Sequence, residues 1–138
     1  MTSMTDRAFI AAFEACTLPN ESFHHQDHVR LAWLYLKDLP PAAALAHFTE
    51  GLQRFASAHG KPGLYHETIT WAYLLLIRER MALSEEGEFE AFAAANPDLL
   101  TWRPSILESY YREETLGSDL ARRVFLLPDR GGAGPRYG

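Results

Sequence analysis

Residues 67–83 read ETITWAYLLLIRERMAL, and this stretch decides the fold class. Apolar side chains cover nearly every face of a helix drawn through it until Arg78, which is typical of a helix buried on most sides. The preceding loop, HGKPGLY at residues 59–65, contains the glycine and proline that interrupt regular structure. We therefore predict a central, buried helix over residues 67–83.

Apolar residues at helical spacing predict three more long helices before this one, and strand patterns are almost absent. Thr5 is placed to cap the first of them, Pro40 ends the second and Gly60 follows the third. The chain after residue 83 shows shorter helical patterns, the last of them with Ser118 as its N-cap. The long helices are expected at residues 6–16, 23–39 and 42–58, and the short ones at 89–95, 105–112 and 120–125.

These elements predict an all-α fold: a single-domain antiparallel helical bundle with additional short C-terminal helices. We expect the domain to span residues 1–127. Residues 128–138, PDRGGAGPRYG, are expected to form a flexible tail. A chain of 138 residues with 47% hydrophobic content suits one domain with a substantial core. In such bundles, ligand and metal sites are built in the core from side chains on facing helices.

Composition excludes several classes of function. The net charge of -5, from 13 Lys and Arg against 18 Asp and Glu, does not provide the basic surface that nucleic acid requires. The most apolar run, WAYLLLI at 71–77, is far shorter than the ~20 residues that span a bilayer, so no membrane association is expected. The lone Cys16 favours a reducing, cytoplasmic location. A small-molecule substrate is the expected partner, and association into a homodimer stays open.

Three histidines gather in FHHQDHVRLAW at residues 23–33. On a helical wheel, His28 lies in the middle of the apolar arc and His24 lies one turn before it on the same arc. His25 falls at the other edge of the arc and Asp27 at its boundary. The i and i+4 rings of an H-x-x-x-H pair can converge on one metal ion, so His24 and His28 are candidate ligands.

A second cluster, YHETIT at residues 65–70, opens the central helix. His66 shares an arc with core residues of that helix, and the adjacent Glu67 suits a helix N-terminus. His24, His28 and His66 would supply three neutral imidazoles and leave an open position for water or substrate, as in catalytic metal sites. This arrangement requires the second and fourth helices to run parallel, with the third helix as the return.

Imidazole ligands without thiolate suit a divalent ion such as Zn, Fe, Ni or Cu, and a carboxylate from Glu67 or Asp27 would favour Fe or Mn. Such an ion would acidify a bound water, with Glu67 or His25 as general base. The resulting hypothesis is a small metal-dependent enzyme, hydrolytic or oxidative. The alternative is a non-enzymatic helical ligand-binding or interaction module, in which the histidines form a structural polar network with Tyr65 and Tyr111.

The C-terminal third adds candidate substrate-binding groups. Tyr111 and Arg122 would cover the site and bind a carboxylated or phosphorylated substrate, since a guanidinium presents a fork of donors. Tyr65, beside the second histidine cluster, is the third candidate. In the competing interpretation Arg122 and Arg123 pair with Glu113 and Glu114 on the surface, and the tyrosines pack at the core edge.

Three segments together resemble a family of small, all-helical, largely uncharacterised bacterial proteins: FHHQDHVRLAWLYL, YHETITWAYLLLI and SYYREETLGSDLARRVFLLPD. The shared pattern is F-H-x-x-x-H-V-R, then Y-H-E-T-x-T, then a closing S-x-x-A-R-x-x-F-x-x-P-D run. The resemblance implies that the family's characteristic positions in this chain are His24, His28, His66, Glu67, Thr68 and Arg122. The chain is also more loosely similar to DinB-type helical bundles, which hold a metal with three histidines that include an H-x-x-x-H pair.

Overall fold

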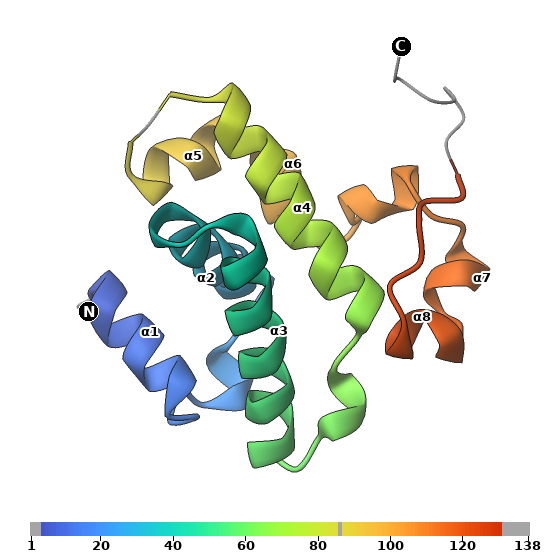
Figure 1. The fold of residues 1–138 in the computed structure, drawn as a ribbon, viewed down its shortest axis with the longest axis horizontal. Helices are drawn as coiled ribbons and strands as arrows, with labels where there is room; N and C mark the ends of the chain where they lie inside the picture. The colour runs from blue at the N-terminus through green and yellow to red at the C-terminus, as the bar shows by residue number, and fades with distance from the viewer. Residues whose placement is uncertain (1–3, 86, 131–138) are drawn as a thin grey trace.

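Helix α4 (Glu67–Leu83) lies between two groups of helices in the computed structural model, which describes residues 4–85 and 87–130 (Figure 1). On one side α4 packs against α2 (His25–Asp38) and α3 (Pro41–Ala58). On the other side it packs against α8 (Asp119–Arg123), near the end of the described chain. The predicted central helix and the all-α single domain are confirmed.

The capping residues identified in the sequence act where they were expected. The Thr5 hydroxyl accepts a hydrogen bond from the Ala8 N–H at 3.1 Å, and the Ser118 hydroxyl accepts one from the Ala121 N–H at the same distance. Gly60, just beyond α3, has a φ of 72°. Glycine adopts that left-handed conformation at little cost, so it ends the helix there. The remaining helices before the C-terminal segment are α1 (Asp6–Glu14), η1 (Asn20–Ser22), η2 (Pro62–Leu64), α5 (Phe89–Ala95) and α6 (Pro97–Leu100).

The helix predicted over residues 105–112 forms only one short 3₁₀ turn, η3 (Ile106–Ser109). The Ser105 hydroxyl accepts from the Leu107 N–H, and the Glu108 carboxylate accepts from the Ser105 N–H. These two bonds close a single turn. The chain then continues into two further short helices, α7 (Glu113–Leu116) and α8. Across the described ranges, no helix is both long and apolar enough to cross a membrane.

Two hydrophobic clusters explain why α4 is apolar on most of its surface. The larger cluster joins Leu74 and Ile77 of α4 to α1, α2 and α3, and both side chains are fully buried. The smaller cluster joins Ala72 and Tyr73 of the same helix to Leu107 and Tyr111. Burial of a large apolar side chain stabilises a fold by about 1.5–3 kcal/mol, so covering both faces of α4 holds the N-terminal and C-terminal parts together.

Helices α2 and α4 run parallel, with α3 as the return between them. Residues from the first turns of α2 and α4, among them His28 and Thr70, line one cavity. Residues from their last turns, among them Leu36 and Met81, line another. Like ends of the two helices therefore lie together, which is the geometric condition that the histidine hypothesis required.

Thr68, in the first turn of α4, is hydrogen-bonded to the C-terminal segment. Its side chain is fully buried, and its hydroxyl lies 2.7 Å from the Ala121 carbonyl oxygen and 2.8 Å from that of Val124. The same hydroxyl accepts from the Leu126 N–H at 3.1 Å. One side chain thus satisfies backbone groups that would otherwise be buried without partners.

The described chain stays hydrogen-bonded up to its last residue. The N–H groups of Asp129 and Arg130 both donate to the Tyr110 carbonyl, at 3.1 and 2.9 Å. The Asp129 carboxylate also accepts from the Arg112 N–H and the Thr115 hydroxyl. Of the tail predicted at residues 128–138, only 128–130 are described, and 131–138 lie outside the described residues.

We predict that Thr68→Val lowers the free energy of unfolding by about 1–3 kcal/mol, because an isosteric apolar side chain removes the buried bond to the Ala121 carbonyl and leaves the part-buried Leu126 N–H unpaired. Thr70→Val is the matched control. Its hydroxyl donates at 2.7 Å to the His66 carbonyl of its own helix, and that carbonyl keeps its bond from the Thr70 N–H. Urea unfolding of both variants is the measurement, and equal losses would contradict the role assigned to Thr68.

Candidate functional site

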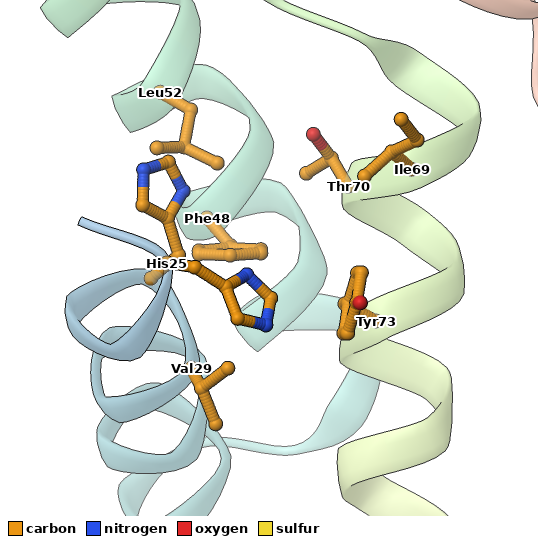
Figure 2. A pocket seen from close by; sticks show the side chains of 8 residues that line it. His25, Val29, Phe48, Leu52, Ile69, Thr70 and Tyr73 are labelled. Carbon is orange, nitrogen blue, oxygen red and sulfur yellow. The ribbon is translucent and has the colours of Figure 1, made fainter. Parts of the chain in front are cut away.

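A recess of about 40 Å³ lies where the first turns of α2 and α4 face the middle of α3 (Figure 2). Figure 2 shows His25 on α2 and Tyr73 on α4 facing one another across this space, with Thr70 on the same side as Tyr73. The volume is enough for one or two water molecules. The complete lining is His25, His28, Val29, Phe48, Leu52, Ile69, Thr70 and Tyr73.

A larger pocket of about 480 Å³, called the histidine pocket below, shares five of those residues and reaches outward to the C-terminal segment. Half of its fourteen lining residues are aromatic or aliphatic, and the other half carry polar side-chain groups. Its volume lies in the range of about 300–1,000 Å³ that is typical of small-molecule sites. Besides the five shared residues, the lining is Asn20, Phe23, Phe55, Ala56, Leu64, Tyr65, His66, Trp102 and Arg122.

His25 is held in one orientation by the backbone and by two aromatic rings. Its Nε2 lies 2.9 Å from the Leu99 carbonyl oxygen, so Nε2 carries the proton and donates it. The ring centroid is 4.7 Å from that of Tyr73 and 5.1 Å from that of Trp102. Burial lowers the pKa of His25, while the bond to Leu99 opposes that shift. The neutral ring keeps Nδ1 as an acceptor.

His28 stacks against Phe23, with ring centroids 4.2 Å apart. Neither ring nitrogen has a hydrogen-bond partner within the described ranges, and the ring lines both the recess and the larger pocket. Burial, with a smaller contribution from nearby His25, lowers the pKa of His28 to about 4. The ring is therefore neutral at pH 7, and it presents one donor and one acceptor to the pocket.

His66 uses both of its ring nitrogens to fix the backbone. Nδ1 accepts from the Ile69 N–H at 3.2 Å, which caps α4, and Nε2 donates to the Leu116 carbonyl at 2.7 Å. Burial is the main cause that lowers the pKa of His66, and Arg122 lowers it further. His66 therefore lies on the pocket wall with its lone pair and its N–H both engaged.

His24 lies on the outside of the molecule. It is the residue before α2, its backbone is extended, and its N–H donates to the Asp27 carboxylate at 2.9 Å. Its side chain is exposed and does not line the pocket that His28 and His66 share. Among the described residues, no three His, Cys, Asp or Glu side chains form a group suited to a metal ion. The predicted ligands His24, His28 and His66 thus do not fit a common metal as the structure places them.

Glu67 and Tyr65 form a hydrogen-bonded pair beside the pocket. The Tyr65 hydroxyl donates to Glu67 Oε1, and burial together with that carboxylate raises the pKa of Tyr65. Glu67 lines a neighbouring pocket of about 410 Å³, together with Arg122, and it does not line the histidine pocket. The two predicted bases are therefore separated, with His25 inside the site and Glu67 beside it.

The two C-terminal candidates differ in their placement. Arg122 lines the histidine pocket, and its Nη1 donates to the Gly63 carbonyl at 2.9 Å. Tyr111 is buried in the smaller core cluster, and its hydroxyl donates to the Leu126 carbonyl at 2.7 Å. Burial and Asp129 raise the pKa of Tyr111 to about 12. Tyr111 therefore packs the C-terminal segment and does not line the pocket.

Several pocket residues were not identified from the sequence. Trp102 follows α6 in an irregular stretch, and Phe23 precedes α2, so neither lies on a helix whose faces periodicity can assign. Thr70 lies one helical turn after His66, on the arc of α4 that faces the recess. The distance of Thr70 from His66, one helical turn, was the one available signal for it.

Comparisons with protein-family models, with curated proteins and with solved structures found no match for this chain. The resemblance seen in the sequence motifs therefore stays a hypothesis. The basis for a functional assignment is the geometry of the pocket and the chemistry of the groups that line it.

We predict that wild-type protein loses about 2 kcal/mol more stability than His28→Phe between pH 7.5 and pH 5. The unfolded chain binds a proton at His28 near pH 6.5, whereas the folded chain binds it only near pH 4. Stability is therefore lost as the pH falls from 6.5 towards 4. Urea unfolding at the two pH values is the measurement. His47→Phe changes an exposed histidine of α3 and should keep the wild-type pH dependence. If His28→Phe loses as much free energy of unfolding between the two pH values as the wild type, the prediction is wrong.

Proposed function

We propose that the protein binds a small organic molecule in the pocket between α2, α3 and α4. The observation that carries this proposal is the 480 Å³ pocket, whose lining brings His25, His28 and Thr70 together with aromatic side chains. A pocket of this size accommodates a ligand of one or two rings. Of the hypotheses from the sequence, the enzyme and the ligand-binding module require such a site, whereas an interaction module with a structural histidine network does not.

The walls favour a flat or apolar ligand body. Phe23, Phe55 and Trp102 line the pocket, and aromatic side chains bind planar groups by stacked or edge-to-face contacts. Hydrogen bonds to the backbone fix the rings of His25 and His66, which lowers the entropic cost of orienting a ligand. The neutral ring of His28 supplies a donor and an acceptor to a ligand in this position.

The two histidines suit different roles. His28, with a pKa near 4, is a weak base at neutral pH, so hydrogen bonding is the role that fits it. His25 has its Nε2 proton committed to Leu99, and its Nδ1 lone pair is oriented by that bond. If the ligand is a substrate, His25 is the candidate general base, as the sequence predicted.

We predict that the neutral fluorescent probe N-phenyl-1-naphthylamine binds with one saturable site per chain. Ala56→Trp should weaken that binding at least tenfold, because Ala56 lines the pocket and an indole at this position would occupy it. Ala46→Trp adds the same bulk at an exposed position on α3 and should bind like the wild type. Fluorescence titration gives the dissociation constants. Equal binding by both variants, or no saturable binding, would contradict the proposal.

A metal-dependent enzyme acting on a small molecule is the second candidate. What favours it is that His28 and Nδ1 of His25 both lack hydrogen-bond partners in the described chain and line the same recess. Catalytic metal sites normally have three protein ligands, so a metal here would need a further ligand beyond these two imidazoles. No reaction step is assigned to such an ion.

Elemental analysis of protein purified without an affinity tag tests this candidate. If the protein is metal-dependent, we expect close to one equivalent of a divalent metal in the wild type. We also expect that metal to be lost in His28→Ala and retained in His47→Ala, with circular dichroism as the check on folding. Metal-free wild-type protein that takes up no added Zn²⁺ would eliminate the metal-dependent enzyme, and it would leave the small-molecule pocket as the proposed function.

A further inference from the structure

The histidine pocket has an unusual charge for this protein. The chain carries 18 Asp and Glu against 13 Lys and Arg, yet among the described residues no carboxylate lines the pocket. Arg122 is the single Lys or Arg in the lining. Burial lowers the pKa of the three lining histidines, so they stay neutral at pH 7. The pocket therefore has a net positive charge within a negatively charged molecule.

Arg122 is held at the pocket and its charge is not neutralised by an ion pair. Its Nη1 donates to the Gly63 carbonyl, which fixes one edge of the guanidinium and leaves other N–H groups for a ligand. The ion pairs of the described residues do not include Arg122. The sequence also allowed Arg122 to pair with Glu113 or Glu114, and the structure shows neither pair.

The two acidic residues that share a pocket lining with Arg122 already have hydrogen-bond partners. Asp119 and Glu67 line the neighbouring pocket of about 410 Å³, on which Arg122 also borders. Asp119 pairs with Arg123 at 2.8 Å, and Glu67 accepts the Tyr65 hydroxyl. Arg123 thus has a carboxylate partner and Arg122, its neighbour in the sequence, does not.

We propose that the ligand of this pocket is an organic anion, with an apolar or aromatic body against the pocket walls and an acid group bound by Arg122. This inference rests on the proposed function of the pocket and adds the chemical class of the ligand. A guanidinium binds carboxylate, sulfonate or phosphate oxygens through paired N–H donors. Arg122 is exposed at the rim of the pocket, so a ligand can reach its guanidinium from solvent.

Two probes with the same aromatic body, one neutral and one anionic, distinguish binding by the pocket walls from binding by its charged group. 8-Anilinonaphthalene-1-sulfonate is N-phenyl-1-naphthylamine with one added sulfonate, so a comparison of the two isolates the contribution of the anion. We expect Arg122→Gln to weaken binding of the sulfonate at least tenfold and to change binding of the neutral probe less than twofold. Arg122→Lys should recover part of the affinity, because it keeps the charge and loses the paired donors.

Arg123→Gln is the matched control, since it removes the adjacent arginine, which does not line the histidine pocket. It should bind both probes like the wild type. Circular dichroism and urea unfolding verify that each variant is folded. If Arg122→Gln weakens both probes equally, or neither, the anion inference is wrong while the pocket stands. If the wild type binds neither probe saturably, the proposed function itself fails.

Competition against the sulfonate probe identifies the kind of acid. Displacement by phenylacetate or by phenyl phosphate at millimolar concentration, without displacement by inorganic phosphate, supports a ligand with both an apolar body and an acid group. Whichever of the two displaces the probe more strongly names the preferred acid. Displacement by inorganic phosphate at the same concentration would overturn the requirement for the organic body.

Discussion

Helix α4 packs against other parts of the protein on two sides, and much of the structure follows from that constraint. A third face, which includes Leu75, Arg78 and Glu79, is exposed. Packing against α2 and α3 covers Leu74, Ile77 and the side of Tyr73 that faces His25, but it leaves Ala72 and the other side of Tyr73 uncovered. The C-terminal segment covers them, and Thr68 secures its backbone with three hydrogen-bond contacts. Because this cover lies beside the first turn of α4, it also brings Arg122 to the pocket.

Periodicity predicted much of this arrangement because helix faces repeat in a fixed way along a sequence. The pattern predicted the long helices, the caps at Thr5 and Ser118, and the helix over residues 67–83. The expectation that His28 and His66 face inward from parallel helices also matches the structure, in which both line one pocket. Short connections on either side of α3 made that parallel arrangement the natural path for the chain.

The rest of the site depends on features that periodicity does not encode. A wheel drawn from residue 24 treats His24 as helical, but its backbone is extended and α2 starts at His25, so its side chain points elsewhere. His66 looks like a free ligand in the sequence, yet its two nitrogens serve Ile69 and Leu116, and only the fold reveals Leu116 as a partner. Trp102 lies in irregular chain, where no spacing rule applies.

Arg122 is synthesised after the residues that form most of the pocket wall. Synthesis runs from the N-terminus, so residues 20–83, which build most of the pocket wall, leave the ribosome before residues 105–130 do. Until those later residues arrive, one face of α4 stays uncovered and available to chaperones or to other nascent chains. Arg122 is placed only when that face is covered. The segment that covers this face of α4 is thus also the segment that supplies the charged group of the pocket.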